Sequence, residues 1–152
     1  MSIIETALHD VNVTVEAQDY QQSGIHAQAE IQAEQLKSVC RALHSFCFFL
    51  ETVTAVDNLS TETMQGVWFF NHYRQSARFK VVIETGRNNP VFPSIGAIYP
   101  GAVWHERETG EFFGIVYDGS KDSRCLLLPE DVTFHPLRKD FKRPEQQIAG
   151  IH

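Results

Sequence analysis

The segment VWFFNHYRQSARFKVVIET, residues 67–85, is the most informative part of the sequence for the architecture. Residues 67–74 and 78–85 are rich in β-branched and aromatic side chains, as strands usually are. Because only Gln75, Ser76 and Ala77 separate them, we expect the two strands to pair as an antiparallel hairpin. The preceding segment FFLETVTAVD, residues 48–57, has the same composition and predicts a third strand.

Before these strands, the sequence predicts one helix and one short strand. Apolar residues recur at intervals of three and four between residues 30 and 46, with Leu36, Val39 and Leu43 on one side and Lys37 and Arg41 on the other. This spacing is typical of an amphipathic helix. The alternating segment NVTVE, residues 12–16, favours a strand.

Two helices and a last extended piece are predicted after the hairpin. Pro93 and Ser94 favour a short helix that reaches Ile98 or Tyr99, where Pro100 and Gly101 stop it. A second helix is expected over residues 102–113, with Gly114 as its C-terminal stop. The segment GIVYDG, residues 114–119, is expected to be extended, and no periodicity follows it.

This order of elements predicts an α+β fold, in which helices pack on one face of a mixed, largely antiparallel sheet. The 152 residues are enough for one domain with a real core. We expect residues 1–119 to form the globular part and residues 120–152 to form an extended C-terminal docking arm of the same unit.

The composition favours a soluble chain in the cytoplasm. No apolar run approaches the roughly 20 residues that span a bilayer, and MSIIETALHD lacks the order of a secretion signal. The three cysteines, Cys40, Cys47 and Cys125, include no C-x-x-C pair, which argues against disulfides, a zinc ribbon and an iron–sulfur site. Phosphate-binding loops, dinucleotide fingerprints and nucleophile motifs are also absent from the sequence.

The C-terminal segment HPLRKDFKRP, residues 135–144, is basic in an acidic protein. The segment carries a net charge of +3, whereas the whole chain carries −6. Because Pro136 disfavours helical backbone before it, we expect this segment to be extended. Leu137 and Phe141 would be apolar anchors on a partner, while Arg138 and Lys139 would pair with its carboxylates. The predicted docking residues are His135, Pro136, Leu137, Arg138, Lys139, Asp140 and Phe141.

The block from Pro100 to Phe141 resembles the C-subunit family of respiratory complex I, the NADH:quinone oxidoreductase, and its relatives in membrane-bound [NiFe] hydrogenases. That family has a W-x-E-R-E-x-x-D/E-aromatic-aromatic-G-I helix, a D-x-R element and then H-P-L-R-K-D-F/Y. The matching residues are Trp104, Glu106, Arg107, Glu108, Glu111, Phe112, Phe113, Gly114, Ile115, Asp122, Arg124 and residues 135–141. The run from Leu128 to Asp131 is more similar to the energy-converting hydrogenase and formate hydrogenlyase branch, so both branches stay open.

The resemblance implies a non-catalytic subunit of a membrane-associated oxidoreductase. Its partners would be the large catalytic subunit and a small iron–sulfur subunit. Iron–sulfur clusters, and nickel–iron or quinone, would belong to those partners, and this chain would hold no cofactor. It would lie on the cytoplasmic side of the inner membrane and contact the membrane only through the complex.

The charged residues of the predicted second helix suggest a structural network. Glu106, Arg107, Glu108 and Glu111 lie within six residues, and Arg124 or Arg138 could bind Glu108 or Glu111 through two hydrogen bonds. The alternative of a small carboxylate-dependent enzyme lacks a pocket of stacking aromatic residues. A free-standing nucleic-acid-binding domain that uses the basic tail fits poorly with an acidic chain.

Overall fold

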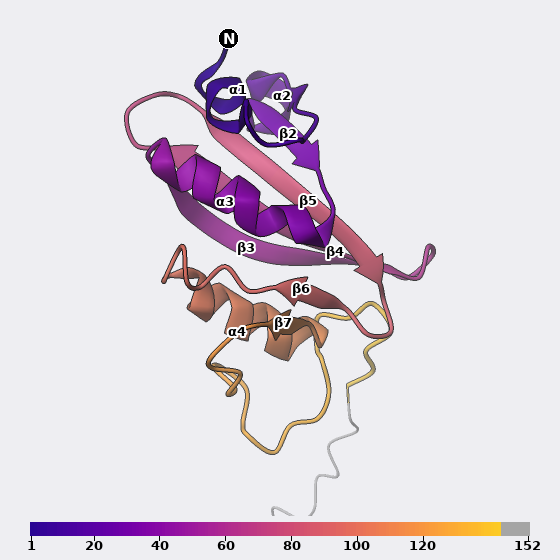
Figure 1. Cartoon of the computed structure of the whole chain (residues 1–152). Coiled ribbons are helices and arrows are strands. Elements are labelled where there is room, and N and C mark those ends of the chain that lie inside the picture. Colours follow the sequence, from indigo (N-terminus) through magenta and orange to yellow (C-terminus); the bar gives the residue numbers. More distant parts are fainter. Residues whose placement is uncertain (144–152) are drawn as a thin grey trace, which may run out of the picture.

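The computed structural model describes residues 1–143, so the last residues of the predicted arm lie outside the described part. A five-stranded sheet with the order β1-β2-β5-β4-β3 forms the centre of the molecule (Figure 1). Its strands are β1 (Glu16–Ala17), β2 (Ala27–Glu30), β3 (Phe48–Asn58), β4 (Thr63–His72) and β5 (Arg78–Gly86). All neighbours are antiparallel except β2 and β5, which are parallel.

Strands β4 and β5 form the predicted hairpin, and the predicted strand β3 pairs antiparallel with β4, so the three strands make a meander. Trp68 pairs with Val53 on one side and with Val81 on the other, and Phe70 pairs with Phe79. Because paired residues point to the same face, these large side chains line one side of the sheet. The mixed, largely antiparallel sheet predicted from the sequence is confirmed.

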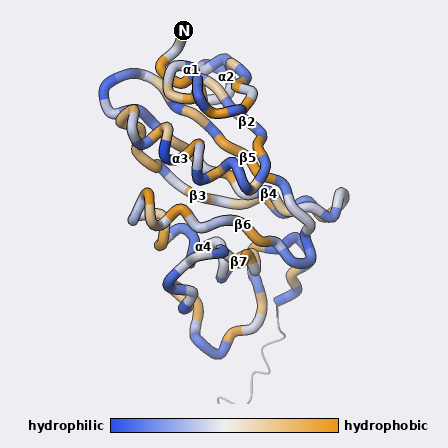
Figure 2. The backbone as a smooth tube through the Cα atoms, viewed as in Figure 1, coloured by the Kyte–Doolittle hydropathy of each residue, from blue (hydrophilic) through white to orange (hydrophobic). Residues whose placement is uncertain are grey.

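The helices cover this apolar face. Helix α1 (Ile3–Leu8) packs on α3 (Leu36–Ser45), and α3 buries Leu36, Val39, Cys40 and Leu43 in the same core as Trp68. Figure 2 shows the tube of α3 alternating between hydrophilic and hydrophobic colours, as expected of a helix with one buried side. Helix α4 (Ala102–Phe113) packs beside the edge strand β3.

The N-terminal part differs from the prediction in several places. The strand β2 over residues 27–30 was not predicted, and the helix expected from about Glu30 begins only at Leu36. Ala27 and Ala29 of β2 are buried opposite Phe79 and Val81. A short 3-10 turn, η1 (Ala33–Gln35), then leads into α3. The predicted strand over residues 12–16 is wrong except at Glu16, because residues 12–15 form no strand and β1 is Glu16–Ala17. The helices α1 and α2 (Tyr20–Ser23) were not predicted. A capping box between Ser2 and Glu5 begins α1.

The C-terminal part of the core contains α4 with the predicted limits and a small parallel sheet of β6 (Val91–Pro93) and β7 (Val116–Asp118). The short helix expected after Pro93 is absent, and residues 96–98 form a turn. The Glu106 carboxylate accepts hydrogen bonds from the Ser94 hydroxyl and the Ile95 N–H, and the Ser94 N–H donates to Asp118. These contacts hold the segment out of a helical path.

The described part of the arm, residues 120–143, contains no helix or strand, but it is not extended. It passes below α4 and returns toward the end of the sheet (Figure 1). Two consecutive turns shape the predicted docking segment, since Arg138 N–H donates to His135 and Phe141 N–H donates to Arg138. The prediction of an extended strap over residues 135–141 is therefore wrong, because it relied on Pro136 and ignored the arm's contacts with the core.

Candidate partner-binding site

Helix α4 carries most of the charged residues predicted to form a network, but Glu106 belongs to the core. Only 2% of Glu106 is exposed, and its carboxylate accepts the Ser94 hydroxyl at 2.7 Å and the Ile95 N–H at 2.8 Å. Burial raises the pKa of this carboxyl above its ordinary value, against the opposing effect of the two hydrogen bonds. The structure thus separates Glu106 from the rest of the predicted network.

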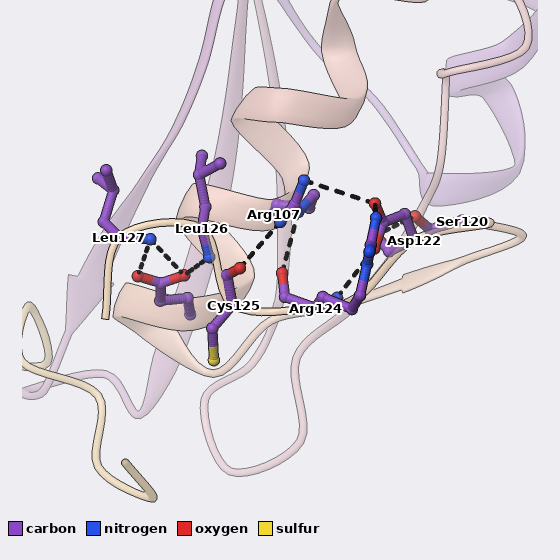
Figure 3. A network of polar contacts seen from close by, with 8 residues as sticks. Arg107, Ser120, Asp122, Arg124, Cys125, Leu126 and Leu127 are labelled. Carbon is purple, nitrogen blue, oxygen red and sulfur yellow. Dashed lines mark hydrogen bonds and ion pairs between the residues drawn. The ribbon is translucent and has the colours of Figure 1, made fainter. Parts of the chain in front are cut away.

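Arg107 binds the arm through backbone carbonyls and one carboxylate (Figure 3). Its Nε donates to Arg124 at 2.9 Å, its Nη2 donates to Cys125 at 2.8 Å, and Nη1 lies 3.4 Å from Asp122. Two hydrogen bonds from Arg124 to Asp122 hold the pKa of the Asp122 carboxyl well below its usual range. Arg107 also lies over the Trp104 ring, 5.3 Å from its centroid.

Glu111 binds the same part of the arm from the next turn of α4. Its carboxylate accepts the N–H groups of Leu126, Leu127 at 2.9 Å and Leu128 at 2.5 Å. Arg107 and Glu111 thus hold carbonyls and amides of consecutive residues, so the grip depends on backbone rather than on side chains of the arm.

The predicted pairing of Glu108 or Glu111 with Arg124 or Arg138 is wrong. Arg124 pairs with Asp122, and Arg138 donates to the Arg87 carbonyl oxygen at 2.5 Å. Glu108 has no hydrogen-bond or ion-pair partner among residues 1–143. The Glu111 carboxylate accepts hydrogen bonds from backbone N–H groups of the arm instead of from an arginine side chain. The spacing of charged residues along a helix does not show which of these donors will bind.

The arm also covers the C-terminal end of α4, where helix carbonyls lack partners within the helix. His135 Nδ1 donates to the Glu111 carbonyl at 2.8 Å, and the Leu137 N–H donates to the Phe112 carbonyl at 3.0 Å. The His135 ring lies directly on Gly114, whose φ is +75°. The first residues of the predicted docking segment therefore fasten the arm to its own helix.

Arg87, Asp57 and Asp140 form a group of charges that we call the Arg87 latch. It holds the next part of the arm, residues 139 and 140. Arg87 Nε and Nη2 donate to Asp57 at 2.5 and 2.8 Å, and Nη2 and Nη1 donate to Asp140 at 2.6 and 3.1 Å. The Lys139 N–H also donates to Asp57, at 2.7 Å. The Asp57 side chain is fully buried and that of Arg87 is 8% exposed. The hydrogen bonds from Arg87 lower the pKa of both aspartates and raise that of the guanidinium.

The sequence interpretation missed Asp57 and Arg87. Asp57 was placed at the end of a strand, and Arg87 in a break between elements. The register provides the signal that could have found them: Asp57 pairs with Met64, and Met64 pairs with Thr85, two positions before Arg87. Asp57 and Arg87 therefore lie at the same end of the sheet, at the ends of the two strands that flank β4, where their opposite charges can meet.

The remaining side chains of the docking segment divide into inward and outward sets. Phe141 stacks on Phe134 with ring centroids 5.2 Å apart, so it is an internal contact rather than a free anchor. Leu137 is 53% exposed, and Lys139, Lys142 and Arg143 are also exposed. Binding of this segment to a partner stays a prediction.

A cavity of about 490 Å³ lies between α4, β7 and the arm, lined among others by Glu111, Tyr117, Cys125, Phe134 and His135. Residues 1–143 contain no cluster of His, Cys, Asp and Glu suited to a metal ion. No helix in this described range is long and apolar enough to cross a membrane.

The fold is that of an α+β domain whose arm is fastened to its own core. The structure matches a chain of the membrane-bound sulfane sulfur reductase, an archaeal respiratory membrane complex, with a TM-score of 0.80 and 20% identity over 92% of this chain and 84% of that one. It also matches a trypsin-resistant fragment of Nqo5 with a TM-score of 0.65 and 21% identity, over 80% of this chain and 99% of the fragment.

The chain belongs to the family of the 30 kDa subunit of respiratory-chain NADH dehydrogenase, whose family model matches residues 29–147. Similar proteins include the NADH-quinone oxidoreductase C subunit of Roseiflexus sp. (strain RS-1), 35% identical over 66% of this chain and 59% of that protein. The corresponding C subunit of Moorella thermoacetica is 35% identical over 62% of this chain and 64% of its own. The chain thus spans about three fifths of these relatives. The resemblance drawn from residues 100–141 is confirmed.

Neither alternative function gains support from the site. Glu106 is buried in the core and Glu111 is occupied by three backbone amides, so the helix offers no pair of carboxylates poised for hydrolysis. Arg138, one of the four cations of the basic tail, is bound to the Arg87 carbonyl and is not free for a nucleic acid.

Proposed function

We propose that the chain is a non-catalytic subunit of a membrane-associated oxidoreductase and braces the large catalytic subunit of that complex through its arm. Family membership over residues 29–147 is the observation that carries the proposal. The relatives named as C subunits of NADH-quinone oxidoreductase support the complex I branch. The arm, fastened to α4 and to the latch, offers a preformed surface for such a partner.

A large catalytic subunit and a small iron–sulfur subunit are the proposed partners. They would hold the iron–sulfur clusters and the nickel–iron or quinone site, while this chain holds no cofactor. The chain would be a peripheral protein on the cytoplasmic side of the inner membrane, would touch the membrane only through its partners, and would bind no nucleic acid. These assignments rest on the family and on the named relatives.

The hydrogenase branch remains the second candidate. One observation keeps it open: the run from Leu128 to Asp131 is more similar to the energy-converting hydrogenase and formate hydrogenlyase branch. Neighbouring genes distinguish the branches. A large subunit with two C-x-x-C pairs for nickel indicates a hydrogenase, and their absence indicates the quinone enzyme.

Co-purification from native membranes tests the proposal. The chain, tagged at its N-terminus and expressed from its own locus, is isolated after mild solubilisation, and its companions are identified by mass spectrometry. We expect the large and small subunits in equal amounts with the chain. A preparation from cells that carry the tag alone is the control. A chain that elutes by itself as a monomer contradicts the proposal.

A further inference from the structure

Four exposed side chains of the arm make no hydrogen bond or ion pair with another residue among residues 1–143. Leu137 is 53% exposed, and Lys139, Lys142 and Arg143 are exposed and form no ion pair with another described residue. We call these four residues the cationic edge. Their neighbours Arg138 and Asp140 point the other way, into the latch.

The charge of this edge is uncompensated. At the latch the charges of Arg87 and Arg138 balance those of Asp57 and Asp140, so these four residues are formally neutral together. Lys139, Lys142 and Arg143 therefore add +3 at the surface of a chain whose net charge is −6, which leaves −9 on all other residues. A cationic strip on an otherwise acidic surface attracts an anionic partner and steers its approach.

The latch also fixes the backbone from which these side chains project. Asp57 accepts the Lys139 N–H at 2.7 Å, and the Phe112 carbonyl accepts the Leu137 N–H at 3.0 Å. A binding segment that is already ordered loses less conformational entropy on association. The edge is thus arranged before any partner arrives.

A hollow of about 240 Å³ lies beside Leu137. Its lining is partly apolar, from Leu137, Phe112 and Phe113, and partly polar, from threonines of β3 and α4 and from the carboxylate of Glu108. An aliphatic or aromatic side chain of a partner can pack on Leu137 and Phe112, while Glu108 can accept a hydrogen bond from an N–H group beside that side chain.

We propose that the cationic edge binds an acidic segment of a partner subunit that carries one apolar side chain, which enters the hollow beside Leu137. This inference rests on the proposed function and adds which residues of this chain bind the partner and what kind of partner segment they bind. Nucleic acid fits the edge less well, because three cations give few phosphate contacts and a long polyanion extends beyond the edge onto the acidic remainder, which repels it, whereas a short acidic segment does not extend that far. An anionic bilayer meets the same repulsion.

Charge reversal with a matched control tests the proposal. The edge variant carries Lys139→Glu, Lys142→Glu and Arg143→Glu. The control variant carries Arg41→Glu, Arg74→Glu and Lys121→Glu, three other exposed cations without an ion-pair partner among residues 1–143, and it has the same net charge. Each full-length tagged variant replaces the native gene, and the isolated membrane complex is washed with NaCl from about 50 to 500 mM.

We expect the edge variant to bind its partner subunits at least about tenfold more weakly and to leave the complex at lower salt than the wild type, while the control variant stays bound. Leu137→Ala should also weaken the complex, whereas Leu127→Ala, at a leucine that is 64% exposed, should not. Circular dichroism verifies that each variant is folded.

Other outcomes overturn the proposal. If the edge and control variants are released at the same salt concentration, the edge is not the docking surface. If the edge variant loses binding only to added duplex DNA or to vesicles with anionic lipid, the occupant is wrong. If the wild type brings down no oxidoreductase subunit, the proposed function itself fails, and that result is distinct because it precedes any comparison of variants.

Discussion

Gly114 shows how a single residue joins the helix to the arm. Its φ of +75° ends α4 in the left-handed region, and a Cβ at this position would lie 2.7 Å from Cδ2 of His135. The helix stop was predicted from the sequence, because glycine after a periodic segment is a local signal. The packing of His135 on it was not predicted, because 21 positions separate the two residues and no local pattern links them.

We expect Gly114→Ala to destabilise the protein by at least about 1 kcal/mol, because alanine in the left-handed region is strained and its methyl group displaces His135. Urea unfolding followed by tryptophan fluorescence measures the change. Gly86→Ala is the control, since Gly86 has ordinary φ and open space at the Cβ position. Equal midpoints for the two variants would contradict the explanation.

Helix α4 carries the side chains that hold the arm against the core. Arg107 holds two carbonyls and Glu111 holds three amides of residues 124–128. The sequence predicted the limits of α4 and the hairpin of β4 and β5, since the residues that specify them are adjacent in the chain. It failed for β2 and for residues 94–99, because contacts with β5 and with Glu106 override their local preferences.

We expect Glu111→Gln to loosen this grip, because the amide side chain has one acceptor oxygen and turns a donor toward at least one of the three N–H groups. Hydrogen exchange should show the amides of Leu126, Leu127 and Leu128 exchanging about tenfold faster. Glu108→Gln, three residues earlier on the helix, is the control and should leave these amides unchanged. Unchanged protection in Glu111→Gln would show that other contacts hold the arm.

For the whole molecule, the Arg87 latch ties the last described residues to the far end of the sheet. Asp57 is on β3, Arg87 follows β5 and Asp140 is on the arm, so three distant segments depend on one guanidinium. Buried charges of this kind are stabilising only when all partners are present. No sequence pattern indicated this group, and only the register of the strands could have suggested its first two members.

The latch predicts that the protein loses stability in acid. Asp57 and Asp140 have lower pKa values in the folded chain than the ordinary 3.8. Their stabilisation is therefore complete above about pH 4 to 5 and is lost as the pH falls from there through the lowered values. Urea unfolding between about pH 2 and 7 should show this decline.

The variant Asp140→Asn should be less stable than the wild type at pH 7 and should lose less stability on acidification. Asp131→Asn, at an exposed aspartate of the same arm without a hydrogen-bond partner among residues 1–143, is the control. If Asp140→Asn follows the wild type at every pH, the carboxylate of Asp140 contributes nothing to the acid response.

The parallel pairing of β2 with β5 has a consequence for the order of folding. His26 and Arg78, which bind each other where these strands meet, are 52 positions apart, whereas β3, β4 and β5 are joined by short turns. Closing long loops is slow compared with forming hairpins. We therefore expect the meander to assemble first and the N-terminal strands to add later, so β2 leaves the ribosome well before the strand that it joins.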